Sequence, residues 1–265
     1  MRARGRGGCR RMNELIDLTG KTGVVTGGSR GVGRATAILL ARAGASVGIA
    51  FRSHQAEAES VVAQLEGLGG RAWAQQGDLT DVADADALLA RAQEEFDGLD
   101  IFVANHGIWP PIDTPLAQMT DEQWHSTMNA NLHSIFYTCR AAARVLRDEG
   151  RLVLVGSTAG QRGEAYHADY ASSKGAMISL VKGLCIELAP RGITVNCVAP
   201  GWIDTEMSAT AYEGEERQRI AESIPIGRIA TAEDVAGPIV FLCSRLGRHI
   251  TGEILNINGG AVLVG

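Results

Sequence analysis

The sequence predicts an α/β fold, in which one domain contains a seven-stranded parallel sheet with helices on both faces. From Lys21 onward, short apolar runs rich in Val and Ile alternate with longer segments of helical period, which is the pattern of βαβ units. The run Leu152–Val155 is apolar at every position, as a strand covered on both faces requires. A length of 265 residues is compatible with one undivided domain of this class.

The strands are expected in seven segments bounded by turn residues. They are Gly23–Thr26, Ser46–Phe51, Arg71–Gln76, Asp100–Ala104, Arg151–Gly156, Thr194–Ala199 and Ile254–Asn258. Between them, Gly44 follows an apolar helical face and predicts a helix C-terminus. Thr120 with Gln123 predicts a capping box at a helix N-terminus, and Thr231 with Asp234 predicts a looser one.

The composition excludes several classes of protein. It is 45% hydrophobic and 21% charged, and no stretch approaches the roughly eighteen apolar residues of a membrane helix. The five cysteines form no CxxC pair and no Cys/His metal spacing; they are Cys9, Cys139, Cys185, Cys197 and Cys243. Since an odd number leaves one thiol out of any complete disulfide pairing, we expect reduced thiols in a cytoplasmic protein without a metal site or a membrane partner.

Charge is distributed unevenly along the chain. The net charge is −5, but five arginines and no acid occupy the first eleven residues, which leaves 20 basic against 30 acidic residues in the remainder. Such an acidic body disfavours nucleic acid as a partner, because duplex binding needs Lys and Arg to neutralise phosphates. Residues 1–17 are expected to be a disordered or spurious extension, with translation starting at Met12 as one explanation. A basic arm or a targeting segment is the alternative, and the lack of an apolar core argues against a secretory signal.

Residues 18–265 are expected to form the single domain. Their least regular part, residues 201–228, carries Gly214, Pro225 and Gly227 between a predicted strand and a predicted helix. Long irregular segments in compact domains are often functional. We therefore expect a loop or a short helical lid there.

A glycine-rich turn follows the first predicted strand and leads into a helix. Its sequence is Thr26-Gly27-Gly28-Ser29-Arg30-Gly31-Val32-Gly33. Glycines at such a place allow a tight turn and bring backbone N–H groups at the positive end of the helix close to a pyrophosphate. The glycines alone would also suit a simple turn between packed elements. Their position at the start of an α/β pattern favours dinucleotide binding, and hence a Rossmann fold.

The end of the second predicted strand bears on the choice of cofactor. Residues 49–53 (IAFRS) contain no acid, whereas sites that prefer NAD usually place one there to bind the ribose 2′-hydroxyl. Arg52 and Arg30 can instead pair with a 2′-phosphate, because guanidinium donors match phosphate geometry. We therefore favour NADP(H) over NAD(H). The alternative is that both arginines are solvated loop residues.

Tyr170 and Lys174 are spaced to act together. Residues four apart share one face of a helix, and an ammonium group favours the phenolate form of a tyrosine, whose ordinary pKa is ~10. Ser157 comes just after a predicted strand. Each residue alone has a structural explanation, since such Tyr/Lys spacings are common and a serine can cap a strand. Together with the glycine-rich turn, they predict proton transfer beside a bound cofactor.

These features resemble the short-chain dehydrogenase/reductase family, and within it the branch similar to 3-oxoacyl-acyl-carrier-protein reductases. The resemblance covers Leu18 to Val264. It rests on the glycine-rich turn, Asp78-Leu79-Thr80, Asn131, Ser157, Tyr170-Ala-Ser-Ser-Lys174, Asn196, Pro200-Gly201 with Thr205, and Thr251-Gly252 with Asn258-Gly259-Gly260. It implies an oxidoreductase that transfers a hydride between NADP(H), or NAD(H), and a secondary alcohol or ketone.

The resemblance also implies a role for each catalytic residue. Tyr170 is the general acid or base, and Lys174 lowers its pKa while holding the nicotinamide ribose. Ser157 hydrogen-bonds the substrate oxygen. Asn131, on the long helix after the fourth strand, supports a water that relays protons to Lys174. The expected cofactor contacts are Gly27, Ser29, Arg30, Gly31, Val32, Gly33, Arg52, Ser53, Asp78, Leu79, Asn105, His106, Gly107, Tyr170, Lys174, Pro200, Gly201, Ile203 and Thr205.

The chain departs from the family pattern after the fourth predicted strand. The family usually has Asn-Asn-Ala-Gly there, whereas residues 104–107 are Ala-Asn-His-Gly. Ala104 lacks a side chain thought to tie the central sheet together. His106 is expected to be a tolerated loop residue near the nicotinamide, with a second titrating group that faces the substrate as the alternative.

Substrate contacts are expected from the segments that follow the carboxyl ends of the strands. The predicted residues are Trp109, Gln161, His167, Trp202 and Met207. A 3-oxoacyl thioester is the first expected substrate, and sugars, steroids or other small secondary alcohols are the alternatives. A cofactor-sensing scaffold is the non-enzyme alternative. The resemblance also implies a homotetramer.

Overall fold

The structure is a computed structural model that describes residues 16–212 and 214–264. Its strands form one seven-stranded parallel sheet in the order β3-β2-β1-β4-β5-β6-β7. The strands are β1 (Thr22–Thr26), β2 (Ser46–Phe51), β3 (Ala72–Gln76), β4 (Leu99–Ala104), β5 (Leu146–Val155), β6 (Thr194–Pro200) and β7 (Ile254–Ile257). The predicted fold class, a parallel sheet with helices on both faces, is confirmed.

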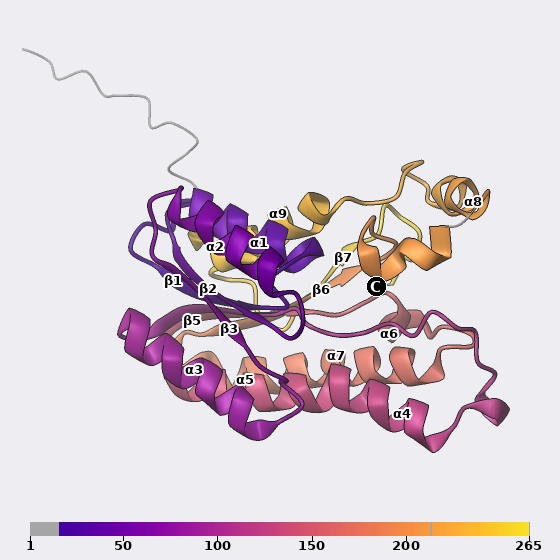
Figure 1. Ribbon diagram of the computed structural model, residues 1–265, viewed down its shortest axis with the longest axis horizontal. Helices are drawn as coiled ribbons and strands as arrows, with labels where there is room; N and C mark the ends of the chain where they lie inside the picture. The colour runs from indigo at the N-terminus through magenta and orange to yellow at the C-terminus, as the bar shows by residue number, and fades with distance from the viewer. Residues whose placement is uncertain (1–15, 213, 265) are drawn as a thin grey trace, which may run out of the picture.

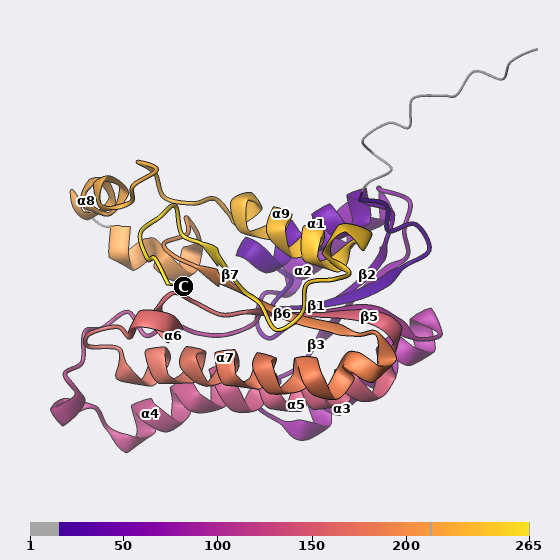
Figure 2. The ribbon, with the colours of Figure 1, turned by 180° about the vertical axis from the view of Figure 1, so that it is seen from behind.

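Helices cover the sheet on both sides (Figures 1 and 2). One layer contains α1 (Gly31–Arg42), α2 (Gln55–Glu66) and α9 (Ala232–Cys243). The other contains α3 (Val82–Phe96), α4 (Asp121–Met128), α5 (Ser134–Val145) and α7 (Ala168–Leu188). Shorter helices are α6 (Ala159–Arg162) and α8 (Glu216–Ser223). Short 3-10 or π-helical segments are η2 (Leu116–Gln118), η3 (Asn129–His133), η4 (Ala189–Arg191), η5 (Glu206–Tyr212) and η6 (Arg245–Gly247).

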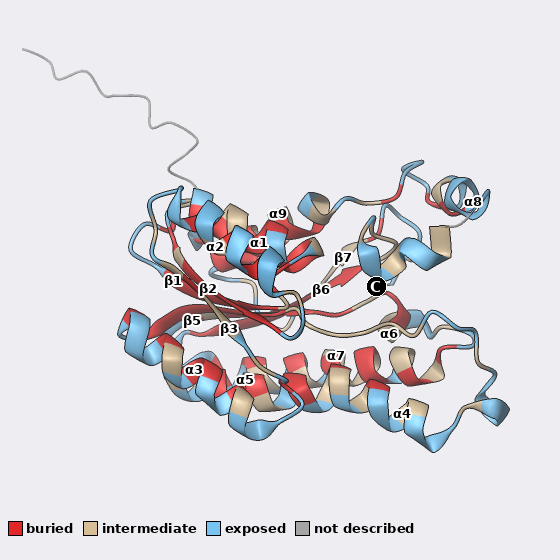
Figure 3. Ribbon diagram, in the orientation of Figure 1, coloured by how far each residue is buried: buried red, intermediate tan, exposed pale blue. Residues whose placement is uncertain are grey.

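Each face of the sheet has its own apolar core, visible as the buried layer in Figure 3. Strand β5 contributes to both, because Leu152 and Leu154 belong to the core shared with α3, α5 and α7. Val153 and Val155 belong to the core shared with α1 and α9. Burying one such side chain contributes about 1.5–3 kcal/mol. Coverage on both faces is the reason why these strands are apolar at every position.

The predicted start of strand β5 was wrong by more than two residues, unlike the predicted starts of the other six strands. It begins at Leu146 rather than at Arg151. Leu146 is buried and pairs with Leu99, after which the register shifts at an irregularity before Arg151 pairs with Ile101. Glu149 has a φ of 61° inside this stretch, so the polar residues between Leu146 and Arg151 are accommodated as an irregularity within the strand.

The predicted helix ends agree with the structure in position, although the capping box expected at Thr120 is only half formed. Helix α1 ends at Arg42, and Gly44 has a φ of +101° just after it. The Thr120 side chain accepts a hydrogen bond from the Gln123 N–H at the start of α4. Thr231 and Asp234 form a complete capping box at α9, tighter than expected. These contacts satisfy N–H groups that have no partner inside the helix.

The carboxyl ends of the parallel strands meet at one edge of the sheet, next to α6, η5 and α8 (Figure 1). Residues 201–228, expected to form a loop or lid, contain η5 and α8. Most of the expected extension 1–17 lies outside the described residues. Over the part of the chain that the structure describes, every helix is too short or too polar to cross a membrane.

Candidate active site

A cleft of about 650 Å³ lies at the carboxyl ends of the strands. It is lined by segments that follow β1, β2, β3, β4, β5 and β6, together with η5 and residues near the C-terminus. This volume is within the range of small-molecule and cofactor sites, roughly 300–1,000 Å³. Ligands of open α/β sheets bind at this edge.

The glycine-rich turn forms one wall of the cleft. Gly27 has a φ of +63° and Gly31 a φ of +53°, conformations that side chains other than glycine rarely adopt. A Cβ atom on Gly33 would lie 2.1 Å from the carbonyl oxygen of Gly27. The backbone can therefore pack this tightly only with glycines, which leaves the N-terminus of α1 open toward the cleft.

Two arginines and one aspartate gather at the outer part of this wall. Arg52 follows β2, and Arg30 comes from the glycine-rich turn. The Nη1 atom of Arg30 lies 2.9 Å from Oε2 of Glu206, at the start of η5. The backbone N–H of Thr80 lowers the pKa of the Asp78 carboxyl, and the charge of Arg52 lowers it further. The site therefore offers two cations, of which Arg30 is paired with Glu206, and the ionised carboxylate of Asp78.

Tyr170 and Lys174, one turn apart on α7, line the cleft with Ser157, which follows β5. Burial raises the pKa of Tyr170 to about 12, while a hydrogen bond with Ser157 acts in the opposite direction. Lys174 Nζ lies 5.9 Å from the centre of the Tyr170 ring and donates to the Val155 carbonyl oxygen at 2.9 Å. Burial lowers the pKa of Lys174 to about 8. The phenol is thus a protonated donor at neutral pH.

Asn131 lies in the π-helical turn η3, rather than on the regular helix expected from the sequence. Its Oδ1 atom accepts from the Ile108 N–H at 2.7 Å, and its Nδ2 atom donates to the Ile108 carbonyl oxygen at 2.9 Å. The same amide group donates to Ser173 Oγ at 3.2 Å. A Cβ atom on Gly107 would lie 2.8 Å from Asn131 Oδ1. Asn131 therefore joins the segment after β4 to α7, behind the residues that line the cleft.

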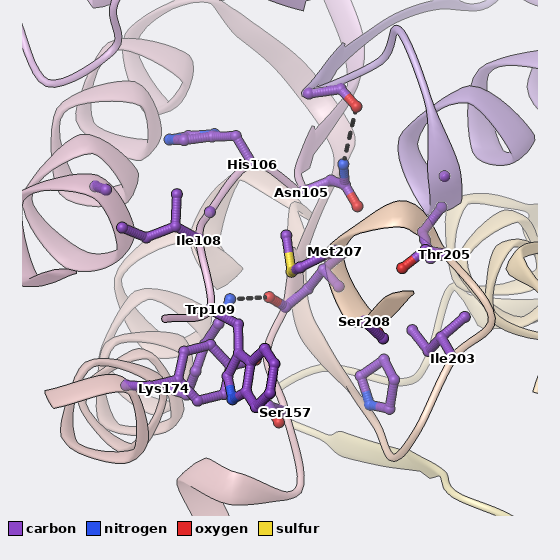
Figure 4. Close-up of a pocket in the computed structure, with 18 of the residues that line it drawn as sticks. Asn105, His106, Ile108, Trp109, Ser157, Lys174, Ile203, Thr205, Met207 and Ser208 are labelled. Atoms are coloured by element: carbon purple, nitrogen blue, oxygen red, sulfur yellow. Dashed lines mark hydrogen bonds between the residues drawn. The ribbon is translucent and has the colours of Figure 1, made fainter. Parts of the chain in front are cut away.

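His106 is held by hydrogen bonds at both ring nitrogens. Nδ1 lies 2.7 Å from the Thr26 hydroxyl oxygen, and Nε2 lies 2.8 Å from Ser134 Oγ. The Ser134 hydroxyl donates to the Ala130 carbonyl oxygen at 2.8 Å, so we infer that Nε2–H donates to Ser134 and that Nδ1 accepts from Thr26. Burial lowers the pKa of His106 to about 3. The imidazole points toward the helices (Figure 4). Its low pKa argues against the alternative that His106 titrates at neutral pH.

The substrate side of the cleft has aromatic walls. Trp109, Trp202 and Met207, three of the predicted substrate contacts, line it. The Trp109 and Trp202 rings meet edge to face at 5.9 Å, and Figure 4 draws Trp109 with Ser157 and Met207. Gln161 and His167 are not among the lining residues. His167 instead packs against Trp109, with the ring centres 5.0 Å apart and the planes tilted by 50°.

The structure brings the predicted cofactor residues together almost completely. All of them line the cleft except Gly33, which packs against the turn. Arg162 and Glu164 also line the cleft, in the segment after β5 whose polar side chains were expected to offer substrate contacts. The predicted set missed Ala261 and Val262. No sequence pattern marks those two residues, because only the fold brings the C-terminal segment to this edge.

Comparisons with known proteins agree with this geometry. The family model described as Enoyl-(Acyl carrier protein) reductase matches residues 27–262. The 3-oxoacyl-[acyl-carrier-protein] reductase FabG of Escherichia coli (strain K12) is 38% identical over 252 residues, which are 94% of this chain and 100% of that protein. An L-rhamnose 1-dehydrogenase (NAD(P)(+)) of Sphingomonas sp. is 37% identical, over 92% of this chain and 96% of that protein.

Solved structures are also similar to this chain over almost its whole length. A dehydrogenase/reductase from Sinorhizobium meliloti 1021 has a TM-score of 0.89 and 38% identity, covering 95% of this chain and 99% of that one. A short chain dehydrogenase from Burkholderia cenocepacia J2315, in complex with NADP, has a TM-score of 0.87 and 40% identity, covering 92% and 98%. The chain therefore belongs to the short-chain dehydrogenase/reductase family and is an NAD(P)-dependent oxidoreductase that acts on CH–OH and keto groups.

Proposed function

We propose that this cleft binds NADP(H) and that Tyr170 exchanges a proton with the oxygen of a ketone or secondary alcohol. One observation carries the proposal. Tyr170, Lys174 and Ser157 line the same cleft as the glycine-rich turn and Arg52. A proton donor and a dinucleotide cradle in one cavity are what a hydride-transfer enzyme of this family needs.

The residues at the glycine-rich wall fit a phosphorylated dinucleotide. A tight backbone turn, which a Cβ atom at Gly33 would block, leaves the helix N-terminus free to hold the pyrophosphate. Arg30 and Arg52 would pair with a 2′-phosphate, and β2 ends without the acid that favours NAD. The NADP complex of the similar Burkholderia enzyme supports the same choice. When bound, NADP(H) supplies or accepts the hydride.

Side chains of the protein donate the proton and stabilise the charge that remains. In reduction, the Tyr170 phenol donates its proton to the carbonyl oxygen, and the Ser157 hydroxyl donates a hydrogen bond to the same oxygen. The raised pKa of Tyr170, caused by burial, keeps the phenol protonated at neutral pH. The Lys174 ammonium then stabilises the phenolate that remains. Asn131 keeps the segment after β4 in place beside them.

Two substrate classes follow from the names of the relatives. The Escherichia coli relative and several other similar curated proteins are 3-oxoacyl-[acyl-carrier-protein] reductases, so a 3-oxoacyl thioester is the first substrate to assay. The L-rhamnose dehydrogenase supports a sugar as the second. Charged side chains on the wall of this cleft, Arg162 and Glu164, favour testing the second class with equal effort.

The test is an assay of NADPH and NADH oxidation with 3-oxobutyryl thioesters and cyclic ketones, and of NADP⁺ and NAD⁺ reduction with L-rhamnose and cyclic alcohols. We expect turnover with NADP(H) that exceeds turnover with NAD(H). Tight NADPH binding without turnover of any compound would instead support the cofactor-sensing scaffold. Weaker binding of NADPH than of NADH would overturn the choice of cofactor.

We also infer a homotetramer that acts in the cytoplasm, as the family resemblance implies. Phe136 on α5 and Ile186 on α7 are exposed apolar side chains on the same helical layer, 44% and 72% exposed. Large exposed apolar side chains often mark subunit contacts. Light scattering after gel filtration measures the assembly, and a monomer at micromolar concentration would contradict this inference.

A further inference from the structure

Glu164 stands on the substrate side of the cleft, close to the reacting groups. It follows α6, where Gly163 turns the chain with a φ of +76°, and it lines the cleft with Ser157 and Tyr170. Its negative charge raises the pKa of Tyr170. The carboxylate therefore lies near the atoms at which the substrate would react.

Two contacts hold the segment that carries Glu164. The Thr114 N–H donates to the Tyr166 carbonyl oxygen at 3.0 Å. The Nε2 atom of His167 lies 3.2 Å from Oδ1 of Asp113. Both contacts join this segment to the one that follows β4. The chain that follows Glu164 is thus held against the segment after β4.

The Glu164 carboxylate lacks a close cation in the structure. Over residues 16–212 and 214–264, no Lys, Arg or His nitrogen lies within 4 Å of it. Glu164 is half-buried, and this burial raises its pKa, although the charges of His167 and Arg162 and a hydrogen bond from Trp109 act in the opposite direction. A half-buried acceptor that faces a cleft is available for a donor group on a ligand.

Aromatic rings complete this part of the cleft. Trp109 follows β4 and Trp202 follows β6, and their rings meet edge to face. Tyr212 of η5 packs against Trp202, with the ring centres 5.9 Å apart, and its hydroxyl donates to the Ile203 carbonyl oxygen at 2.7 Å. The wall therefore offers flat apolar surfaces beside one carboxylate.

We propose that Glu164 accepts a hydrogen bond from a hydroxyl group of the substrate and that the substrate is a polyhydroxylated ring, a sugar or a cyclic polyol. The ring would lie against Trp109 and Trp202, with Tyr170 at the reacting oxygen. This inference rests on the proposed function of Tyr170. An alkyl chain is the poorer fit, because it would cover the carboxylate without replacing the hydrogen bonds that water gives it.

The experiment compares two alcohols that differ by one hydroxyl group, trans-cyclohexane-1,2-diol and cyclohexanol, as substrates for NADP⁺ reduction. L-rhamnose and the reduction of a 3-oxobutyryl thioester are measured beside them. The variants are Glu164→Leu, which removes the acceptor, and Glu164→Gln, which keeps part of it. Glu187→Gln, on an exposed part of α7, is the matched control. Thermal unfolding and the Kd for NADPH show whether each variant is folded.

We expect wild type to prefer the diol over cyclohexanol. Glu164→Leu should lower kcat/KM for the diol and for L-rhamnose by about 10- to 100-fold, the range for a hydrogen bond to a charged group. It should change kcat/KM for cyclohexanol far less, since only the charge beside Tyr170 is altered there, and Glu164→Gln should lie between. Equal effects of Glu164→Leu on both alcohols would overturn this inference but not the proposed function. The same holds if wild type prefers the thioester and Glu164→Leu does not change that preference. No turnover of any of these compounds would overturn the proposed function instead.

Discussion

The two ends of the cleft are built in different ways. At the cofactor end, the wall is backbone, and its shape depends on glycines within one short turn, such as Gly27 and Gly33. At the substrate end, the wall is made of side chains such as Trp109, Glu164 and Trp202, which come from three different loops. The first end is therefore encoded by a local motif, and the second by the packing of segments far apart in the sequence.

Tyr170 lies where the two ends meet, so changing it should have the largest effect. Tyr170→Phe removes the transferable proton and should lower kcat by about 10²- to 10⁴-fold, the usual contribution of a positioned general acid. The Kd for NADPH should stay the same, because the ring remains. Steady-state kinetics and fluorescence titration measure both. Tyr137→Phe on α5, outside the cleft lining, is the control; turnover in Tyr170→Phe at the level of this control would contradict the mechanism.

Arg52 tests the cofactor end by itself. Arg52→Ala should reduce the ratio of kcat/KM with NADPH to that with NADH by about 10- to 100-fold, because one charge-assisted hydrogen bond to a 2′-phosphate is lost. The selectivity between alcohols should not change. Arg42→Ala, at the far end of α1, is the control. If the cofactor ratio is the same in both variants, Arg52 is a solvated loop residue.

Trp202 tests the substrate end by itself. Trp202→Ala removes a ring that contacts both Trp109 and Tyr212, so it should raise KM for the alcohol by roughly tenfold while the Kd for NADPH stays the same. Trp124→Ala, on α4 away from the cleft, is the control. An equal loss of affinity for cofactor and alcohol would show that the two ends are not independent.

His106 should have the smallest effect, and on stability rather than on catalysis. Its pKa is about 3 in the folded chain, against an ordinary value of 6.5. At a pH between these two values, the unfolded chain therefore binds a proton that the folded chain does not. Wild type should therefore lose about 1 kcal/mol of unfolding free energy between pH 7 and pH 5.5 through this group. Urea unfolding of His106→Gln should show a shallower dependence on pH. Parallel profiles of the two proteins would contradict the neutral, buried state.

Much of the fold was predictable because strands and turns have local signals. Six of the seven strands begin within about two residues of their predicted starts, and the Thr231 cap was found from its spacing to Asp234. The start of β5 was not predictable, since Leu146 joins the sheet only through its pairing with Leu99. The π-helical turn around Asn131 was not predictable either, because the hydrogen bonds between Asn131 and the segment after β4 form only in the folded chain.

By itself, the sequence determined the sheet, the glycine-rich turn and the pairing of Tyr170 with Lys174, because each depends on residues a few positions apart. Only the tertiary structure decided that His106 is a neutral link between β1 and α5. Only the tertiary structure likewise decided that, of two polar side chains expected near the substrate, Glu164 lines the cleft while His167 packs against Trp109. Burial and contacts between distant loops set the charge and the orientation of these side chains, and neither is a property of nearby sequence.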